Sequence, residues 1–595
     1  MNHLKYDGGT GDLKNWLIQE STFDSRFLGK CEAIFAQGNG YMGVRNALEE
    51  AYPREVRNTF VAGTFNKASA EEVTELPNVP DMTGMTILID GHVFNLMQGK
   101  VRAYTRTMNL KNGETVRKIQ WESPNGIHVS AIFKRMVSLA DEHMLAAVVD
   151  LTVDQDVPIV IETGIDGSVT NSGAQHFRDL RRRVYDGRDM QYLSRTTESD
   201  VWVAQHAACS LNLQADILPI MERRTLKNRY TFMAKAGQNI HFEKISAIHT
   251  SRDLEYEDAK TEGIEEKLMA DGLKSLREGI SKGYQGLKEA SALQWEKYWR
   301  ESGITIDGDT DLEQLAVRFS LYHLNIMAKQ DDNRIGIGAK ALTGEGYKGH
   351  SFWDTELFIL PYFTFTRPGV AKSLLEYRYK NLVGARRKAK ENGYEGAMYP
   401  WECAWVDDGE VTPLYKGADV VTGKVKKVLT GLIEHHISAD IAYAVWQYYL
   451  VTGDRDFMEN CGYEMILDTA LFWASRVQYR EETDRYEILD VIGPDEYKEH
   501  VDNNAYTNYM ANYNMHLALF IMENLLDDNT ELSKRLDHKL NLSYIKEKID
   551  SCIDRLYLPG PDKDGIIPQT DEYLHLTKID ITKYKNSEEA KISYK

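Results

Sequence analysis

The chain has 595 residues, of which 42% are hydrophobic and 27% charged, and its formal net charge is -19. At about 150 residues per domain, this length predicts roughly four domain-sized units, each large enough to bury a core. The composition excludes a disordered or low-complexity chain. The excess of acidic residues argues against nucleic acid or an anionic membrane as the main partner.

Five cysteines are scattered along the chain, without a C-x-x-C pair: Cys31, Cys209, Cys403, Cys461 and Cys552. This spacing is typical neither of a disulfide framework nor of a zinc motif, so we expect buried thiols, a reducing compartment and no metal. The N-terminal MNHLKYDGGTGDLKNW lacks the apolar segment of a signal peptide, and no apolar run reaches the ~18 residues of a membrane helix. We therefore expect a soluble cytoplasmic protein.

The first ~250 residues have the pattern of a β-sandwich. Residues 128–137 alternate with a period of about two, and residues 144–167 contain two apolar runs separated by Asp and Pro. Turn signals recur between the candidate strands: Asp90-Gly91, Asn112-Gly113, Asn125-Gly126 and Asp186-Gly187. Many short strands with frequent turns favour antiparallel sheets over a parallel one.

The pattern becomes helical after His249. Residues 254–300 are charged and helix-favouring, which predicts linker helices between two domains. Thr310 and Glu313 form a capping-box pattern at the start of an amphipathic helix, whose apolar face would comprise Leu315, Phe319, Tyr322 and Ile326. Further helices are predicted near residues 370–391, 437–452, 456–480, 507–526 and 531–557.

Long loops between these helices carry carboxylates and tryptophans, and such loops are often functional. Residues 344–363 place Trp353, Asp354 and Glu356 at a helix start, where acidic residues also suit the helix dipole and a tryptophan suits the core. Residues 398–410 contain Trp401 and Glu402. A pyranose would stack on the indole and donate its hydroxyls to the carboxylate, although a core or interface loop would use similar residues.

A third loop, at residues 491–514, presents Asp495 and Glu496 on a Gly-Pro turn. Helix N-capping explains Asp502 and Asn504 in this loop but leaves Glu496 without a structural reason. Other chemistries have less support. The side chains of the adjacent His435 and His436 diverge on a helix, unlike an i, i+4 metal pair. The sequence contains neither a P-loop nor a G-x-S-x-G elbow. Cleavage of a glycosidic bond is the reaction that carboxylate- and tryptophan-rich loops favour.

Three long segments and the N-terminal EAIFAQGNGYMGVRNALEE resemble the inverting α-glucoside phosphorylases of glycoside hydrolase family 65. The segments are GIGAKALTGEGYKGHSFWDTELFILPYF, GAMYPWECAW and GPDEYKEHVDNNAYTNYMANYN. The family includes phosphorylases for maltose, trehalose, kojibiose and nigerose, and the resemblance covers essentially the whole chain. It implies an N-terminal β-sandwich at residues 1–250, a helical linker at 251–305 and an (α/α)6 barrel at 306–595. The activity that it implies is inverting phosphorolysis of an α-linked glucose disaccharide, which gives β-glucose 1-phosphate and a free acceptor sugar.

The resemblance also implies roles for individual residues. Glu496 falls on the family's general acid, and Trp353, Asp354, Trp401 and Glu402 fall on positions that hold the non-reducing glucose. Inorganic phosphate is then the co-substrate and no other cofactor is expected. As an acid, Glu496 must be protonated at neutral pH although free Glu titrates near ~4.3, so we expect burial and neighbouring carboxylates such as Asp495 or Asp354 to raise its pKa.

Acceptor specificity is expected to depend on residues 417–449, where His435, His436 and the stretch Lys424–Lys427 are candidates. Within the family, this segment is more similar to the kojibiose, trehalose and nigerose branches than to the maltose branch. Lys595 falls on a lysine that contributes to the family's phosphate site, and the family's remaining phosphate ligands lie beyond that position. The resemblance therefore implies an incomplete barrel in this chain, and it implies a homodimer.

Two other functions remain open at this point. The first is an inverting α-glucoside hydrolase, in which a second carboxylate about 6.5–9.5 Å from Glu496 would activate water. The second is a non-catalytic sugar-binding relative. Turnover of α-linked disaccharides with and without phosphate distinguishes all three.

Overall fold

The computed structural model describes residues 3–256, 262–308, 311–415, 423–526, 530–578, 580 and 582. The chain divides into two compact units. The first unit comprises Met1–Asn381, Glu402–Val411 and Leu450–Gly453, and the second comprises Leu382–Trp401, Thr412–Tyr449 and Asp454–Lys595. None of the helices within the described ranges is both long and apolar enough to cross a membrane.

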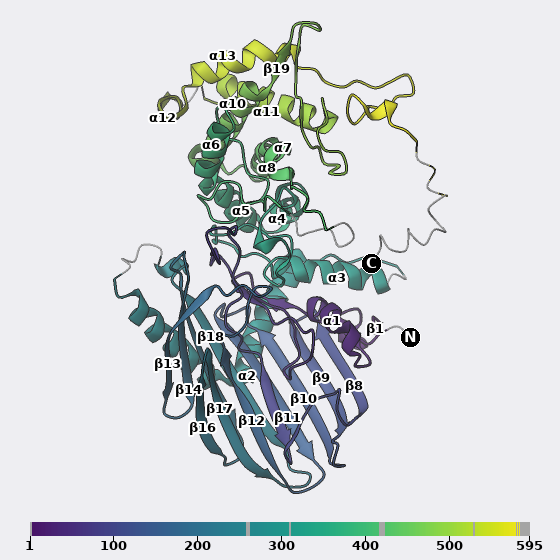
Figure 1. The fold of residues 1–595 in the computed structure, drawn as a ribbon, viewed down its shortest axis with the longest axis vertical. Coiled ribbons are helices and arrows are strands. Elements are labelled where there is room, and N and C mark those ends of the chain that lie inside the picture. Colours follow the sequence, from purple (N-terminus) through teal and green to yellow (C-terminus); the bar gives the residue numbers. More distant parts are fainter. Residues whose placement is uncertain are drawn as a thin grey trace. The chain divides into compact units, whose positions relative to one another are not determined.

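The first unit contains a large antiparallel β-sandwich (Figure 1). Its ten-stranded sheet has the order β1 (Leu4–Lys5), β2 (Leu17–Glu20), β8 (Lys100–Asn109), β9 (Glu114–Glu122), β10 (His128–Val137), β11 (Met144–Val153), β18 (Ile240–Thr250), β15 (Trp202–Leu211), β14 (Asp189–Thr196) and β13 (Phe177–Tyr185). The five-stranded sheet has the order β16 (Asp216–Glu222), β17 (Thr225–Ala234), β12 (Val157–Asp166), β6 (Met85–Ile89) and β7 (His92–Val93). A small sheet joins β3 (Gln37–Gly38), β4 (Met42–Val44) and β5 (Thr59–Val61).

Apolar side chains on alternate positions of the strands form the core of the sandwich, as the period of two requires. Trp121, Phe133, Ile161, Tyr230 and Phe242 all belong to this buried core. The strand predicted at residues 128–137 is β10, and the two runs predicted at 144–167 are β11 and β12, so these predictions are confirmed.

The turn signals are confirmed as well. Asp90 and Gly91 both have positive φ, at 49° and 77°, between β6 and β7. A two-residue connection with two positive φ angles is the type I′ turn whose twist matches a hairpin, and Asp-Gly tolerates it best. Asp186 and Gly187 likewise have positive φ, between β13 and β14.

The predicted linker helices form one long element, α2 (Ile264–Ser302), which packs on the outer face of the large sheet. Leu276, Tyr284 and Leu287 of α2 lie in one buried cluster with Met144 and Ile245 of the sheet. Gly283 interrupts the helix with φ 63° and ψ 176°, a conformation that essentially only glycine adopts.

The described residues of the first unit also contain the α-helices α1 (Leu28–Ile34), α3 (Asp311–Asn325), α4 (Leu360–Thr366) and α5 (Pro368–Lys380). Thr310 of the predicted capping box lies outside the described residues, and α3 begins directly after it. The predicted apolar face is confirmed, because Leu315, Tyr322 and Ile326 are buried together with Trp295 of α2.

The described part of the second unit contains helices, the loops between them and one hairpin, β19 (Gln478–Arg480) and β20 (Arg485–Glu487). Its elements are α6 (Leu382–Glu391), α7 (Thr430–Ile433), α8 (Ile437–Thr452, whose last turn falls in the first unit), α9 (Arg455–Phe457), α10 (Tyr463–Arg476), α11 (Ala505–Asn524), α12 (Thr530–Leu540) and α13 (Leu542–Cys552). The prediction for residues 437–452 is confirmed by α8. The single helical stretch predicted at 531–557 is wrong, because Asn541 adopts φ 59° and caps a new helix by accepting a hydrogen bond from the backbone N–H of Tyr544.

Candidate active site

Glu496 lies in the loop between β20 and α11, in the second unit. It lines a pocket of about 500 Å³ together with Lys426, Lys427, Val428, Leu429, Thr430, Ile492, Pro494, Asp495, Tyr497 and Glu499. A hydrogen bond of 3.1 Å from the backbone N–H of Ile492 to the carbonyl of Ile433 ties this loop to α7. The carboxyl group of Glu496 is exposed on the pocket wall. The prediction that Glu496 is buried is therefore wrong, because the Gly-Pro turn projects the side chain away from the core.

A buried chain of ionisable groups leads from this pocket into α8. His436 contacts Asp440 through Nδ1 at 2.6 Å and Glu434 through Nε2 at 3.2 Å. Tyr506 of α11 donates its hydroxyl to the other oxygen of Asp440 at 2.8 Å. Glu434, His436 and Asp440 are each 0% exposed. The Oε2 atom of Glu434 has no hydrogen-bond partner among the described residues.

The protonation of this chain follows from burial and from the charges around it. Burial raises the pKa of Glu434 to about 7; His436 opposes the shift, and the charges of Glu496 and Asp440 add to it. Burial alone would lower the pKa of His436, but Asp440 and Glu434 outweigh it and raise that pKa to about 9. Asp440 and Glu434 account for the raised pKa of His436, whereas burial accounts for the raised pKa of Glu434. The charge of Glu496 contributes to the shift of Glu434, so these two carboxyl groups are electrostatically coupled.

Trp401 and His435 are neighbours of His436 and make different contacts. The Trp401 ring is 3% exposed and packs edge-on against the His436 ring, with 5.3 Å between centroids. His435 contacts the carbonyl of Leu432 at 2.9 Å, and Arg476 donates to its Nδ1 at 3.2 Å. Burial, with the Arg476 charge in addition, holds the pKa of His435 well below its usual value. His435 is thus neutral and engaged in structural contacts, whereas His436 belongs to the charged chain.

In the first unit, two of the predicted sugar-binding loops are held together. Ser351 and Cys403 exchange backbone hydrogen bonds of 2.9 and 3.0 Å. Arg378 of α5 spans both loops, because it donates to the carbonyl of Phe352 at 2.8 Å and to the sulfur of Cys403 at 2.7 Å. Its guanidinium also makes two 2.8 Å bonds to the carboxylate of Glu356. Glu356 is therefore a structural partner of Arg378.

Three predicted glucose-binding residues lie on these loops. Asp354 is exposed at the start of the helical turn Thr355–Ile359, as the helix-start interpretation predicts, but its side chain makes no capping hydrogen bond. Trp353 is half-buried and packs edge-on against Phe358 at 5.2 Å. Glu402 is 8% exposed and accepts a 2.6 Å hydrogen bond from Nδ1 of His350, a buried residue whose Nε2 contacts the carbonyl of Thr74. Because the other imidazole nitrogen contacts a carbonyl, the orientation of His350 and hence of Glu402 is fixed.

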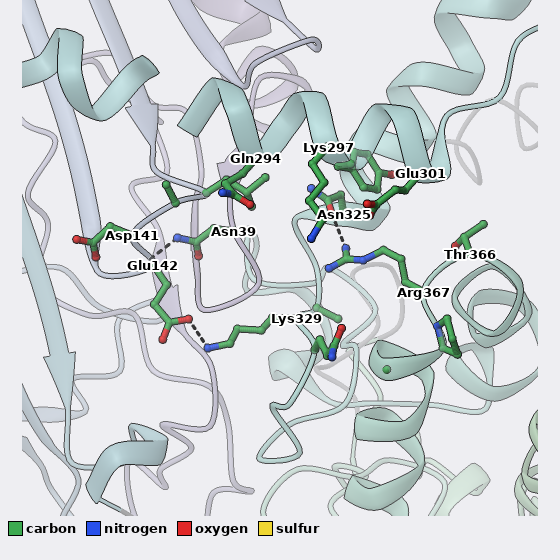
Figure 2. A pocket seen from close by; sticks show the side chains of 17 residues that line it. Asn39, Asp141, Glu142, Gln294, Lys297, Glu301, Asn325, Lys329, Thr366 and Arg367 are labelled. Atoms are coloured by element: carbon green, nitrogen blue, oxygen red, sulfur yellow. Dashed lines mark hydrogen bonds and ion pairs between the residues drawn. The ribbon is translucent and has the colours of Figure 1, made fainter. Parts of the chain in front are cut away.

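A larger pocket of about 850 Å³ lies elsewhere in the first unit, between α2, α3 and the loop before α5 (Figure 2). Among its charged residues, Glu142 pairs with Lys329, and Arg367 donates to the amide oxygen of Asn325. Its one aromatic lining residue, Tyr298, is 6% exposed and bonded through its hydroxyl to Tyr362 and the carbonyl of Leu321. The lining includes the carboxyl groups of Asp141, Glu142 and Glu301 but provides no open stacking surface for a sugar ring, so this pocket is the weaker candidate for sugar chemistry.

Two domain models of one family match the two parts of the chain. Residues 18–298 match the glycosyl hydrolase family 65 N-terminal domain, and residues 318–594 match the family's central catalytic domain. The kojibiose phosphorylase of Halothermothrix orenii is 45% identical over 599 residues, which cover 98% of this chain and 75% of that protein. The chain belongs to glycosyl hydrolase family 65.

Other family 65 proteins agree with this assignment. The kojibiose phosphorylase of Escherichia coli is 38% identical, with 96% of this chain and 72% of that protein covered. The α,α-trehalose phosphorylase of Thermoanaerobacter brockii is 31% identical, with 96% and 74% covered. A solved structure described as a putative kojibiose phosphorylase from the human microbiome superposes with a TM-score of 0.85 at 21% identity, covering all of this chain and 75% of that one. That likeness supports the fold, a β-sandwich followed by a helical domain.

The sequence reasoning missed one carboxyl group of the candidate site, Glu434, and it named one residue, Lys595, that the structure does not describe. Glu434 was missed because it stands between apolar residues and two histidines, where no loop signal marks it. The i, i+4 spacing of His436 and Asp440 was the available signal, because it places both side chains on one face of a helix. Lys595, the predicted phosphate ligand, lies outside the described residues.

Proposed function

We propose that this family 65 protein catalyses the reversible, inverting phosphorolysis of an α-linked glucose disaccharide, with kojibiose as the first candidate. The similarity to the H. orenii kojibiose phosphorylase over 98% of the chain carries the proposal. Both kojibiose phosphorylases named above share more identity with this chain than the trehalose phosphorylase does.

In this proposal Glu496 is the general acid. It gives its proton to the glycosidic oxygen as the bond to the anomeric carbon breaks, while an oxygen of phosphate attacks that carbon from the opposite face. The products are β-glucose 1-phosphate and the acceptor sugar. Glu434 lies close enough to Glu496 for the two charges to interact, since the charge of Glu496 helps to raise the pKa of Glu434.

The remaining site residues take binding roles. Asp354 and Glu402 accept hydrogen bonds from glucose hydroxyls, and Trp353 supplies apolar surface for the sugar ring. Trp401 supports the glucose site through its ring contact with His436. His436 supplies a positive charge to the site and is hydrogen-bonded to the carboxyl groups of Glu434 and Asp440. Lys595 binds the phosphate co-substrate.

A matched pair of assays tests the proposal. The purified chain is incubated with kojibiose, trehalose, nigerose and maltose separately, with and without inorganic phosphate. We expect glucose 1-phosphate from kojibiose only in the presence of phosphate. Glucose released without phosphate would instead indicate a hydrolase, and no turnover of any disaccharide would indicate a binding protein.

We further propose a cytoplasmic homodimer. An acidic chain with reduced cysteines suits that compartment, and the described part contains five cysteines, none of them in a disulfide. Light scattering coupled to size exclusion measures the mass directly, and a mass of one chain at micromolar concentration would contradict the dimer.

A further inference from the structure

Three side chains from separate elements meet at the edge of the large sheet, and none of them is among the residues assigned above. His3 directly precedes β1, Glu20 ends β2 and Cys31 lies in α1. Leu4 pairs with Glu20 across the two strands, and the Ser21 backbone N–H donates to the carbonyl of His3 at 3.2 Å. The pairing of β1 with β2 thus brings His3 beside Glu20.

The distances between the donor atoms are those of ligands around one metal ion. Nε2 of His3 lies 3.1 Å from Oε1 of Glu20 and 3.5 Å from the sulfur of Cys31. All three atoms lie within 4.8 Å of one another. Tetrahedral zinc, with bonds of about 2.0–2.3 Å, needs ligand atoms about 3.3–3.6 Å apart. Binding therefore requires side-chain adjustments of about 1 Å or less for the widest pair.

Burial and outer contacts orient the set. Cys31 is 0% exposed and Glu20 2% exposed, whereas the side chain of His3 is 10% exposed and provides access. Tyr104 donates its hydroxyl to Oε2 of Glu20 at 2.8 Å, so Oε1 remains directed at His3. Thr22 contacts Nδ1 of His3 at 3.4 Å, which leaves Nε2 as the inner nitrogen. Outer partners of this kind fix the orientation of metal ligands.

Charge and ligand type favour zinc over calcium or magnesium. A thiolate and an imidazole are soft or borderline ligands, which hard cations avoid. Zn²⁺ with one thiolate and one carboxylate is neutral overall. The Arg106 guanidinium, 3.6 Å from Glu20, lies against the carboxylate oxygen that faces away from His3. The cluster was missed in the sequence because 17 residues separate His3 from Glu20 and the three ligands form no compact motif.

We propose that His3, Glu20 and Cys31 bind one Zn²⁺, with water as the fourth ligand. The Cys31 thiol releases its proton to solvent as the Zn–S bond forms, and the other two ligands keep their covalent structure. The ion links β1 to β2 and α1. Because β1 is only two residues long, few hydrogen bonds hold it, and the metal supplies the missing attachment.

The test uses the full chain purified without a histidine tag and freed of metal with a chelator. Zn²⁺ alone is titrated and bound metal per chain is measured, and Co²⁺ is then substituted to reveal thiolate-to-cobalt charge-transfer absorption. We expect one Zn²⁺ per chain and that absorption band in the wild type. Cys31→Ser should abolish the band and weaken Zn²⁺ binding about 100-fold or more.

Two further variants keep the result decisive. His3→Gln replaces a side chain of similar size that is partly exposed, so the variant should fold normally and still lose zinc affinity. Cys461→Ser removes a partly buried cysteine in the second unit and should leave zinc affinity unchanged. Phosphorolysis by each variant confirms that it is folded. Less than a stoichiometric amount of zinc in the wild type, or an unchanged cobalt band in Cys31→Ser, would overturn the proposal.

Discussion

The ion pair between Arg378 and Glu356 is expected to support both sugar-binding loops of the first unit. The Arg378 side chain is 0% exposed and the Glu356 side chain 1% exposed, and two 2.8 Å hydrogen bonds join them. Replacing Glu356 with Gln leaves the positive charge of the Arg378 guanidinium buried without its carboxylate partner. One of the two hydrogen bonds to this side chain is also lost, because Gln has a single acceptor oxygen. Removing one partner of such a pair destabilises a protein by about 3–5 kcal/mol.

That loss is large enough to measure in two ways. The first unit has about 400 residues, so at about 2.1 cal/mol/K per residue a loss of 1 kcal/mol shifts Tm by about 1.2 °C, and Glu356→Gln should lower Tm by about 4–6 °C. The substitution also loosens Phe352 and Cys403, which Arg378 holds by its remaining bonds. Because Asp354 and Glu402 are neighbours of these residues, KM for the disaccharide should rise more than kcat falls.

A surface ion pair serves as the matched control. Arg229 and Glu162 lie 2.6 Å apart on the sandwich, with side chains 44% and 21% exposed. Glu162→Gln should cost less than about 1 kcal/mol, because solvent screens exposed pairs. A double replacement of Glu356 and Arg378 by leucine should recover part of the lost stability. If Glu356→Gln and Glu162→Gln change Tm equally, the reasoning about the buried charge is refuted.

Three further predictions concern the proposed chemistry. Glu496→Gln should reduce kcat about 10²–10⁴-fold, because no proton reaches the leaving oxygen, and should leave Tm unchanged since the side chain is exposed. Asp354→Asn should raise KM for the disaccharide in steady-state phosphorolysis, because a hydroxyl acceptor becomes a partial donor, and it should leave Tm unchanged. The third concerns pH: with a folded pKa of about 9 against about 6.5 unfolded, protonation of His436 stabilises the fold fully below pH 6.5 and progressively less as pH rises through 9. His436→Gln, measured by urea unfolding, should therefore be less stable at pH 6.5 and lose less stability between pH 6.5 and 9.

Each of these has a result that contradicts it. For Glu496→Gln the control is Glu499→Gln, which changes a carboxylate of the same pocket that is paired with Lys426. Equal activity of the two variants would remove Glu496 from its role. An unchanged KM in Asp354→Asn would mean that this carboxylate does not touch the sugar. Parallel stability curves for the wild type and His436→Gln would show that His436 is neutral in the folded protein.

The sequence predicted most of the secondary structure, because periodicity reports which faces are buried. The alternation at residues 128–137 and the helical pattern at 437–452 correspond to β10 and α8 residue by residue. Errors occurred where one residue changes the direction of the backbone. Asn541 divides a predicted helix without interrupting the apolar pattern around it. The several linker helices predicted at residues 254–300 form one element, which a break at Gly283 divides.

The candidate site was predicted less completely than the fold. Motif resemblance located Glu496 and Asp354, but the protonation of a carboxyl group depends on its three-dimensional surroundings. Glu496 proved to be exposed, whereas Glu434 is a buried carboxyl group with a raised pKa, hydrogen-bonded to His436 just before α8. Burial and coupling of this kind have no signature in a single sequence.

The interruption at Gly283 has a mechanical consequence for the long helix α2. Its 39 residues would form a straight rod of about 58 Å, which could touch a twisted sheet along only part of its length. At the break, the backbone N–H of Tyr284 is instead bonded to the carboxylate of Glu243 on β18, at 3.0 Å. The element therefore consists of two helical segments that meet at Gly283. A shift of the first segment along the sheet would be accommodated at Gly283, and Trp295 in the second segment would keep its neighbours.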